Sequence, residues 1–489
     1  MPSISEILAN NDFGQIVSAL CVDTIENREP REYYNEYHGE RQRRKTSVGW
    51  REPKRLAVYS DTLKDKHGSP LRLPDKIVDV ARIVTNFPKK EVRTSTAFLF
   101  GGKMTITATD QNDGFQEFKR VWERKLKMQS VLKTFARKVL SESKAALVFY
   151  PYTSTGLDGK ITTELKVKIL SVPKNKNILS EFYPHFDDND DLDAFIHKFQ
   201  VLSSGMIRNS CVVWTADKII TATDDMGGWT RKEVPNLFGK IPVVYADVFA
   251  PEWDDVACIM DAREMRLSRM ADTNDYFAEP ILKTYGDSDL PSKETTGKDI
   301  NFPIKVDEIT GKEFHGDADY LTWTGSQPSV DKELEETKSE QYAGTSTPDL
   351  SFDNLKGVGN VSGVARKFMM MDAMIKASDN MEVFGPVVQR CVSIVTAGIC
   401  DITNIKYRTQ LVNNLIDVDF GSILPEDLAE TLQNLSIANG GKQINAQRTI
   451  TAQSPYTEDL DEEMKLIEQE EETSAQRNSM VGLTMGYGE

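Results

Sequence analysis

The sequence predicts an α+β protein in which strand-rich and helix-rich stretches occupy different parts of the chain. Residues 145–248 contain several segments in which apolar and polar residues alternate, whereas residues 251–283 and 362–401 keep apolar residues at spacings of three and four. The balance of charge is acidic, with 75 Asp and Glu against 59 Lys and Arg and a formal net charge of -16. At 489 residues the chain is long enough for two to four compact units or one elongated subunit.

Charge and composition limit the classes of function. An acidic chain does not coat nucleic acid nonspecifically, because affinity for phosphates depends on basic clusters that release counterions. The N-terminus lacks a basic leader and no apolar run approaches about 18 residues, so we expect a soluble, unsecreted protein without membrane contact. Five cysteines are dispersed without CxxC spacing and five histidines are isolated, so we expect reduced thiols, no metal site and no cofactor.

The first basic cluster follows three tyrosines, in "REYYNEYHGERQRRK" at residues 31–45. One interpretation is a nucleic-acid surface, in which bases stack on the tyrosines and phosphates pair with the arginines. The other is a helix whose tyrosines pack while Arg41, Arg43 and Arg44 stay in solvent. We favour the second interpretation.

The next stretch predicts helices around one strand. Apolar residues at 78–84 indicate a helical face, and Pro88 marks the start of another helix that a Gly-Gly pair ends. Residues 103–109 alternate apolar and polar side chains and predict a half-buried strand. Residues 115–143 predict a long charged helix.

Around residue 251 the pattern changes to long helices. Apolar residues at helical spacing predict a first helix of roughly thirty residues that ends at Pro280. Residues 284–328 are rich in Gly, Pro, Asp and Thr and predict a small β-rich module. A second, acidic helix over 329–345 follows, so the module is an insertion between two helices.

A glycine cluster, "LKGVGNVSGVARK" at residues 355–367, precedes the longest predicted helix. It lacks the hydrophobic strand and the glycine spacing that a dinucleotide site requires. The chain also has no P-loop and no GxSxG motif, so neither nucleotide binding nor catalysis is indicated. We expect a mobile loop instead, in which Gly357, Gly359 and Gly363 give the backbone its freedom.

The helix that follows covers some forty residues, over 362–401. Gly385 and Pro386 lie inside it, and an interior proline removes a backbone hydrogen bond and clashes with the preceding turn, so we expect a kink there. Two further helices are predicted, at 424–441 and in the acidic stretch 457–472.

The order of these elements, together with several local motifs, resembles the portal proteins of tailed bacteriophages, specifically the family of phages with long flexible tails. The matching segments are "YYNEYHGE" (33–40), "IVTNFPKKEVRTSTAFLFGGKMTI" (83–106), "GKIPVVYADV" (239–248), "IMDAREMRLSRMADTNDYF" (259–277), "NVSGVARKFMMMDAMIKA" (360–377), "LPEDLAETLQNL" (424–435) and "EDLDEEMKLIEQEE" (458–471). Residues 150–235 carry no signature that we match to the family.

The resemblance implies a portal fold with named parts. These are a mixed α/β wing over 1–250 with part of 385–417, helical stem segments over 251–283 and 329–345, a small β-rich clip over 284–328, a tunnel loop over 346–361, a long kinked helix over 362–417 that returns to the wing, and a helical crown with a tail over 418–489. Portal proteins of this kind are subunits of a ring and do not hydrolyse ATP themselves.

The resemblance also implies a role and partners. The ring, usually a dodecamer, would stand at one capsid vertex of the virion, where double-stranded DNA enters during packaging and leaves during ejection. The implied partners are the terminase large subunit, a head-tail adaptor, and the major capsid and scaffolding proteins, with assembly in the host cytoplasm.

Site residues follow from that role and from charge. Acidic walls repel phosphates, so a channel can conduct DNA without binding it, and we expect such a wall at Glu333, Glu335, Glu336 and Glu340. In the tunnel loop we expect DNA contacts from Asn354, Lys356 and Asn360.

Two alternatives remain open. One is a capsid-associated connector or scaffold that does not conduct DNA. The other is an enzyme that binds a cofactor at the glycine loop, residues 355–363.

Overall fold

The computed structural model describes most of the chain up to residue 421 and shorter stretches beyond it. The described residues are 4–10, 12–22, 28–64, 66–155, 161–203, 206–225, 228–278, 281–285, 304–306, 309, 311, 313–314, 317–321, 327–350, 368–421, 423, 437, 447–451, 460 and 463–473. The chain divides into two units, one formed by Met1–Val361 with Ala365–Ile423 and the other by Ser362–Val364 with Leu424–Glu489.

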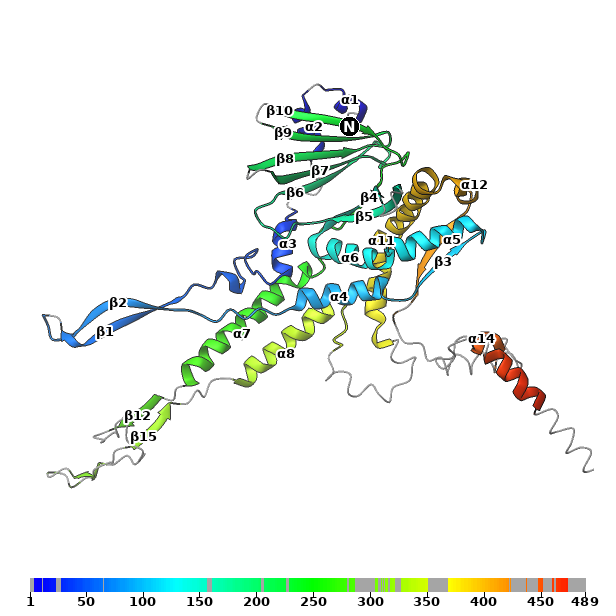
Figure 1. Ribbon diagram of the computed structural model, residues 1–489. Coiled ribbons are helices and arrows are strands. Elements are labelled where there is room, and N and C mark those ends of the chain that lie inside the picture. Colours follow the sequence, from blue (N-terminus) through cyan, green and yellow to red (C-terminus); the bar gives the residue numbers. More distant parts are fainter. Residues whose placement is uncertain are drawn as a thin grey trace, which may run out of the picture. The chain divides into compact units, whose positions relative to one another are not determined.

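Strands in the middle of the first unit form two antiparallel sheets (Figure 1). A five-stranded meander has the order β10-β9-β8-β7-β6, and a three-stranded sheet has the order β11-β4-β5. The strands are β4 (Lys144–Thr155), β5 (Ile161–Leu170), β6 (Ser180–Phe186), β7 (Leu192–Ser203), β8 (Met206–Trp214), β9 (Lys218–Asp225), β10 (Gly228–Pro235) and β11 (Val243–Asp247). The strand-rich character predicted for 145–248 is confirmed.

Two N-terminal helices, α1 (Ile4–Leu8) and α2 (Phe13–Leu20), pack on the five-stranded sheet. The side chain of Asp12 caps α2 by accepting a hydrogen bond of 2.9 Å from the backbone N–H of Gly14. Apolar side chains from both helices and the sheet share one buried cluster: Leu8, Phe13, Ile16, Leu20, Ile196, Cys211 and Val213.

The largest core lies between helices and the three-stranded sheet. Its helices are α4 (Phe87–Phe100), α5 (Asp113–Arg120), α6 (Met128–Glu142) and α11 (Met371–Gly398). Aromatic rings meet edge to face at its centre, where Phe384 contacts both Phe100 and Phe135. The helix predicted to start near Pro88 is confirmed as α4. The helix predicted over 115–143 is divided, because Lys127 adopts a left-handed conformation before α6 begins.

A short sheet joins distant parts of the first unit. The predicted strand at 103–109 is confirmed as β3 (Met104–Ala108), and it pairs with β16 (Ile416–Phe420). The backbones approach so closely that a Cβ on Gly102 would lie 1.5 Å from the carbonyl oxygen of Gly421. Strand β16 belongs to the first unit, and the crown predicted from residue 418 stays a prediction.

Helix α11 forms the central part of the predicted long helix. It runs without interruption through Pro386 to Gly398 and continues as a π-helical turn over Ile399–Thr403. We predicted one helix as far as residue 417, but the stretch after Thr403 is not helical throughout. It contains two short helices, Ile405–Tyr407 and α12 (Arg408–Leu411), and the start of β16. The kink at Gly385 and Pro386 stays a prediction.

Residues Met371–Thr403 are long and apolar enough to span a membrane by length and composition alone, which differs from our expectation that no apolar run approaches this length. More than half of the most apolar window, 56%, is buried inside the structure. Core helices of soluble proteins meet the same criterion, and the apolar composition of α11 is explained by its packing against α4 and β11.

The two helices predicted on either side of the insertion are present and contact each other (Figure 1). They are α7 (Ala257–Ala278), which has 22 residues where we expected about thirty, and α8 (Gln327–Gly344). Between them lie two short antiparallel pairs among the described residues. Strand β12 (Ile281–Tyr285) pairs with β15 (Asp317–Leu321), and β13 (Lys305–Val306) pairs with β14 (Glu313–Phe314). The expected end at Pro280 falls outside the described residues.

One element was not predicted and one prediction was wrong. Strands β1 (Lys54–Lys64) and β2 (Pro70–Val78) form a two-stranded hairpin. Residues 79–86, which include most of the helical face predicted at 78–84, form neither a helix nor a strand. The physical reason is that backbone N–H groups of this segment donate hydrogen bonds to side chains of α7.

The second unit contains α14 (Gln447–Thr451) and a helical stretch over 463–473. The latter overlaps the acidic helix predicted for 457–472 and ends one residue after it. The helix predicted at 424–441 falls, except for residue 437, outside the described residues.

Candidate functional site

One side of α7 buries polar side chains. Asp261, Glu264, Ser268 and Asp272 follow one another at spacings of three and four, which puts them on a single stripe of the helix. The first three are at most 1% exposed. Buried polar groups are costly unless they are paired, so this polar face of α7 must be satisfied by another part of the chain.

The segment 79–86 supplies part of that pairing. Backbone N–H groups of Ala81, Ile83 and Thr85 donate to Asp272 (2.8 Å), Ser268 (2.9 Å) and Glu264 (2.7 Å), respectively. Alternate residues of a strand are about 6.6 Å apart and residues four apart on a helix about 6 Å, so the two spacings match. The side chains of α7 therefore serve this segment as a second strand would.

Arg41 completes the pairing of Glu264. Its guanidinium binds both carboxylate oxygens, with Nε to Oε2 at 2.9 Å and Nη2 to Oε1 at 3.1 Å. Both side chains are almost completely inaccessible to solvent. The remaining Arg41 donors reach the carbonyl oxygens of Glu36 and Thr85. This bidentate, fully desolvated geometry makes the pair sensitive to loss of either member.

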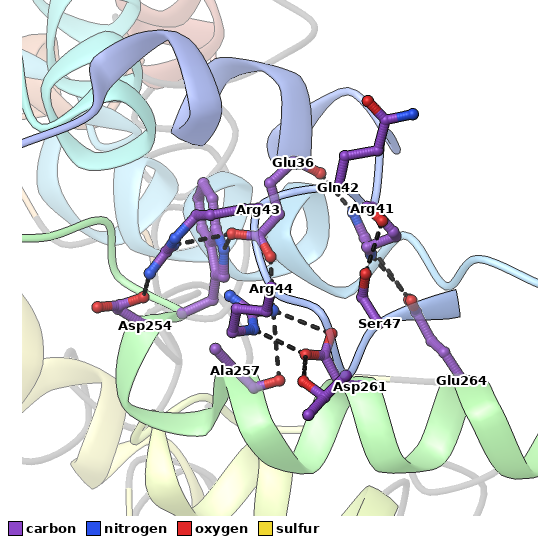
Figure 2. A network of polar contacts seen from close by, with 12 residues as sticks. Glu36, Arg41, Gln42, Arg43, Arg44, Ser47, Asp254, Ala257, Asp261 and Glu264 are labelled. Atoms are coloured by element: carbon purple, nitrogen blue, oxygen red, sulfur yellow. Dashed lines mark hydrogen bonds and ion pairs between the residues drawn. The ribbon is translucent and has the colours of Figure 1, made fainter. Parts of the chain in front are cut away.

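Glu36 of α3 (Pro30–Tyr37) joins two more arginines to α7 (Figure 2). Its carboxylate accepts from Arg43 at 2.9 Å, lies 2.5 Å from Arg44 and accepts from the indole N–H of Trp253 at 3.0 Å. Arg43 also pairs with Asp254 at the entry to α7. The network thus connects a helix near the N-terminus to residues more than 200 positions later.

Arg44 connects Glu36 to Asp261 of α7. Its Nε and Nη2 atoms donate to the two carboxylate oxygens at 2.7 and 3.0 Å, as Figure 2 shows. Burial opposes the charge on Arg44, but hydrogen bonds and charges of Asp261 and Glu36 outweigh it and raise the pKa of the guanidinium. Arg44 therefore stays charged inside this network.

Asp272 fixes the base of the hairpin. Arg51 donates to its carboxylate at 2.7 Å, and Lys54, the first residue of β1, lies 3.3 Å away. Partial burial tends to raise the pKa of Asp272, but the N–H of Ala81 and these two cations outweigh it, so the pKa lies below its ordinary value. We call the whole set, residues 36–54 and 79–86 with the polar face of α7, the α7 brace.

A glycine allows the brace to close. The backbone turns through residues 47–50 so tightly that a Cβ on Gly49 would lie 1.6 Å from the carbonyl oxygen of Arg41. Ser47 bonds to that same oxygen at 2.6 Å. Only a residue without a side chain fits there.

The brace corrects our interpretation of the basic cluster. Arg41 is buried and Arg43 and Arg44 are largely so, each in ion pairs, whereas we expected them in solvent. These contacts also leave the cluster no free guanidinium for a nucleic-acid surface. The signal that could have found them was the stripe of acids at helical spacing in α7, which in a soluble helix calls for basic partners.

A second cluster holds the start of α11. Lys376 lies 3.1 Å from Glu91 of α4 and 3.5 Å from Glu252, and it donates to the carbonyl oxygen of Thr345 at 3.0 Å. Burial raises the pKa of Glu91 from 4.5 to about 8, with the charge of Lys376 opposing the shift and that of Glu252 adding to it. We call these residues the α11 anchor.

The end of α8 is held next to it. Asp349 accepts from Lys90 of α4 at 2.8 Å and lies 2.8 Å from Lys338 of α8. Partial burial opposes the charge of Asp349, but the two lysines outweigh it and hold the pKa of the carboxyl well below its usual range. Asp349, inside the predicted tunnel loop, and Lys376, after it, are thus both tied to α4.

The predicted acidic wall divides into two stripes on α8. Glu333, Glu336 and Glu340 share one stripe by their spacing, and Glu335 lies off it, one turn after Asp331. Glu333 is paired with Arg266 of α7 at 2.7 Å, and Glu336 lies 3.5 Å from Lys332 of its own helix. Glu335, Glu336 and Glu340 are exposed. Glu333 therefore helps to join the two helices.

The site residues predicted in and just after the tunnel loop lie outside the described part of the chain, whereas residues 346–350 of the loop are described. These site residues are Asn354, Lys356, Gly357, Gly359, Asn360 and Gly363. Within the described residues, no three His, Cys, Asp or Glu side chains gather as metal ligands would.

The fold and its polar networks define a class of protein. Charged side chains are used to brace long helices against a mixed α/β body, and two adjacent helices lead into a small β-rich insertion. This is the construction of a structural subunit. The chain belongs to the phage portal proteins of the SPP1 Gp6-like family, whose family model matches residues 7–477. No curated protein matches the chain.

Membership in this family gives the coarse function. The chain is a phage portal protein, of a structural family that is not a family of enzymes, and its place is in a capsid-associated ring at the capsid vertex of the virion. The resemblance found in the sequence is confirmed.

Proposed function

We propose that the chain forms a ring, a dodecamer, whose central channel passes double-stranded DNA into the capsid during packaging and out of it during ejection. The observation that carries this proposal is the family match, which covers nearly the whole chain and leaves no large segment for a different activity. In the proposed ring the terminase large subunit and the head-tail adaptor dock on the same subunits. Major capsid and scaffolding proteins surround it during assembly in the host cytoplasm.

We assign the parts of a portal subunit to the observed helices and strands. The first sheets and helices form the wing, α7 and α8 the stem, and the short strands between them the clip. The α7 brace supports the assignment of α7 as a stem helix, because it ties α7 rigidly to the wing. A helix that transmits force between a motor and a capsid needs such a fixed end.

The channel wall is proposed on α8. Glu336 and Glu340 are exposed and share a stripe with Glu333, so a ring of α8 helices would present repeated acidic side chains. Like charges repel the phosphates of passing DNA. Lys356, with Asn354 and Asn360, is proposed to touch the DNA backbone from the loop that follows α8.

Electron microscopy of the purified protein and a packaging assay test the proposal together. We expect rings with a central channel, and capsids assembled with the wild-type protein that retain full-length DNA. Shortening residues 351–361 should leave the rings intact and reduce packaging or retention. Particles without a channel would contradict the portal assignment, and rings that never pass DNA would favour the connector or scaffold alternative.

A further inference from the structure

The β1–β2 hairpin is an exposed arm for which the described part of the chain provides no packing surface. It is a sheet of two strands only, paired for instance at Leu56 with Lys76 and at Val58 with Leu73, so both of its edges are open. An isolated two-stranded hairpin is at best marginally stable in water. Open edges and a marginal ribbon point to a partner outside the described subunit.

The arm exposes large apolar side chains. Leu56, Tyr59, Leu63, Leu71 and Ile77 are all between 41% and 68% exposed. Apolar side chains that gather on one element, in place of scattering singly, mark an interaction surface. The partner surface must therefore accept apolar contacts.

The arm is basic although the protein is acidic. Residues 54–78 contain six Lys and Arg against three Asp, whereas the whole chain has a formal net charge of -16. Arg55, Lys64 and Lys76 are exposed and form no ion pair with another described residue. A partner of complementary, acidic character is expected.

Helix α8 is an acidic element whose exposed carboxylates could bind the basic side chains of the arm. Residues 327–344 contain five Asp and Glu against two Lys. Asp331 and Glu335 lie one turn apart on one stripe, both exposed, and neither forms an ion pair within the described part of the chain. This stripe differs from the one that holds Glu333.

The arm and α8 are bound to different faces of α7. The base of the arm is bound through Lys54 and Arg51 to Asp272 on the polar face of α7. Helix α8 is bound to α7 through Arg266, which comes six positions before Asp272 and so points about 120° around the helix from it. Asp272 and Arg266 therefore bind the arm and α8 on different faces of the same helix.

We propose that the β1–β2 arm of one subunit docks on α8 of the neighbouring subunit, with its basic side chains against the stripe of Asp331 and Glu335. This inference rests on the proposed ring. A ring is built from a heterologous contact in which each subunit offers one flank to one neighbour and the other flank to the next. The arm and α8 are two such flanks with opposite charge. Glu335 is then an intersubunit residue, and Glu336 and Glu340 remain in the channel wall.

Charge reversal tests the contact. One variant carries Arg55→Glu, Lys64→Glu and Lys76→Glu, a second carries Asp331→Lys and Glu335→Lys, and a third combines all five. Native mass spectrometry and sedimentation velocity measure the fraction of rings over a range of NaCl concentrations. We expect each single-sided variant to weaken subunit association at least about tenfold, and the combined variant to regain most of the loss, because every reversed pair is attractive again.

Glu336→Lys with Glu340→Lys is the matched control, since it makes the same change of charge on the other stripe of the same helix. We expect this control to keep the ring stability of the wild type. Equal loss in the control and in the Asp331 variant, or no rescue by the combined variant, would overturn the proposal.

A photo-crosslinking residue at position 59 tests proximity directly. In rings mixed from isotope-labelled and unlabelled subunits, we expect crosslinks to join Tyr59 of one subunit to residues 327–344 of another. Crosslinks to any other segment would overturn the contact and leave the ring itself untouched. If the charge-reversed arm variant still forms rings but its capsids no longer retain DNA, the arm contacts DNA and not α8, which would also overturn the proposal. A wild-type protein that forms no ring would overturn the proposed function itself.

Discussion

Helices α7 and α8 are neighbours of similar length and comparably rich in charge, yet they use their charges in opposite ways. On α7 the carboxylates of Asp261 and Glu264 are buried and bound by arginines from a segment more than 200 residues earlier. On α8 most carboxylates are exposed, and among the described residues only Glu333 pairs with another element. The number of charges on a helix does not reveal whether they stabilise the subunit or are presented to partners; burial decides.

The largest effect should come from breaking the buried pair of the brace. Glu264→Ala leaves the guanidinium of Arg41 buried without its carboxylate and frees two donors of Thr85. We expect a loss of about 3–5 kcal/mol in the free energy of unfolding. Chemical denaturation measures the loss, and hydrogen exchange of residues 79–86 should rise with it. A loss below about 1 kcal/mol would show that the pair is not desolvated as described.

The next largest loss of stability is expected from Gly49→Ala. The new Cβ would meet the carbonyl oxygen of Arg41, so the backbone that carries the brace must move, at a cost of about 1–3 kcal/mol. Thermal unfolding measures the change. Gly68→Ala in the hairpin turn is a useful control, since no atom lies within 4 Å of a Cβ there and only its positive φ of 80° is strained.

The α11 anchor should make stability depend on pH. The pKa of Glu91 is about 8 in the folded protein against 4.5 ordinarily, so the folded state keeps a proton that the unfolded chain releases. The stability that this proton provides is present below about pH 4.5 and is lost as the pH rises through 8. Unfolding measured from pH 5 to 8 should show the wild type losing at least about 1.4 kcal/mol more than Glu91→Gln, the equivalent of one pKa unit. Equal slopes in the two proteins would contradict the burial of a protonated Glu91.

The smallest effect is expected where α7 and α8 meet. Arg266 and Glu333 are 38% and 42% exposed in their side chains, so solvent screens their attraction. A double-mutant cycle with Arg266→Ala and Glu333→Ala should give a coupling of about 0.2–1 kcal/mol. A coupling as large as that of Arg41 with Glu264 would erase the contrast between the two helices.

Local patterns determined much of the fold. The strand-rich middle, the helix after Pro88, the strand β3 and the helices α7, α8 and α11 were predictable because each shows its period within its own residues. The family, too, could be recognised from the order of these elements together with short motifs.

Tertiary structure alone decided what the polar side chains do. Residues 79–86 carry an apolar spacing that suits a helix, but they are not helical, because Asp272, Ser268 and Glu264 accept their backbone hydrogen bonds. Arg41 would be a solvated cation in its own sequence neighbourhood, and it is buried because its carboxylate partner stands 223 positions later. Such pairings leave no period in either segment, since the interaction exists only after both have been brought together.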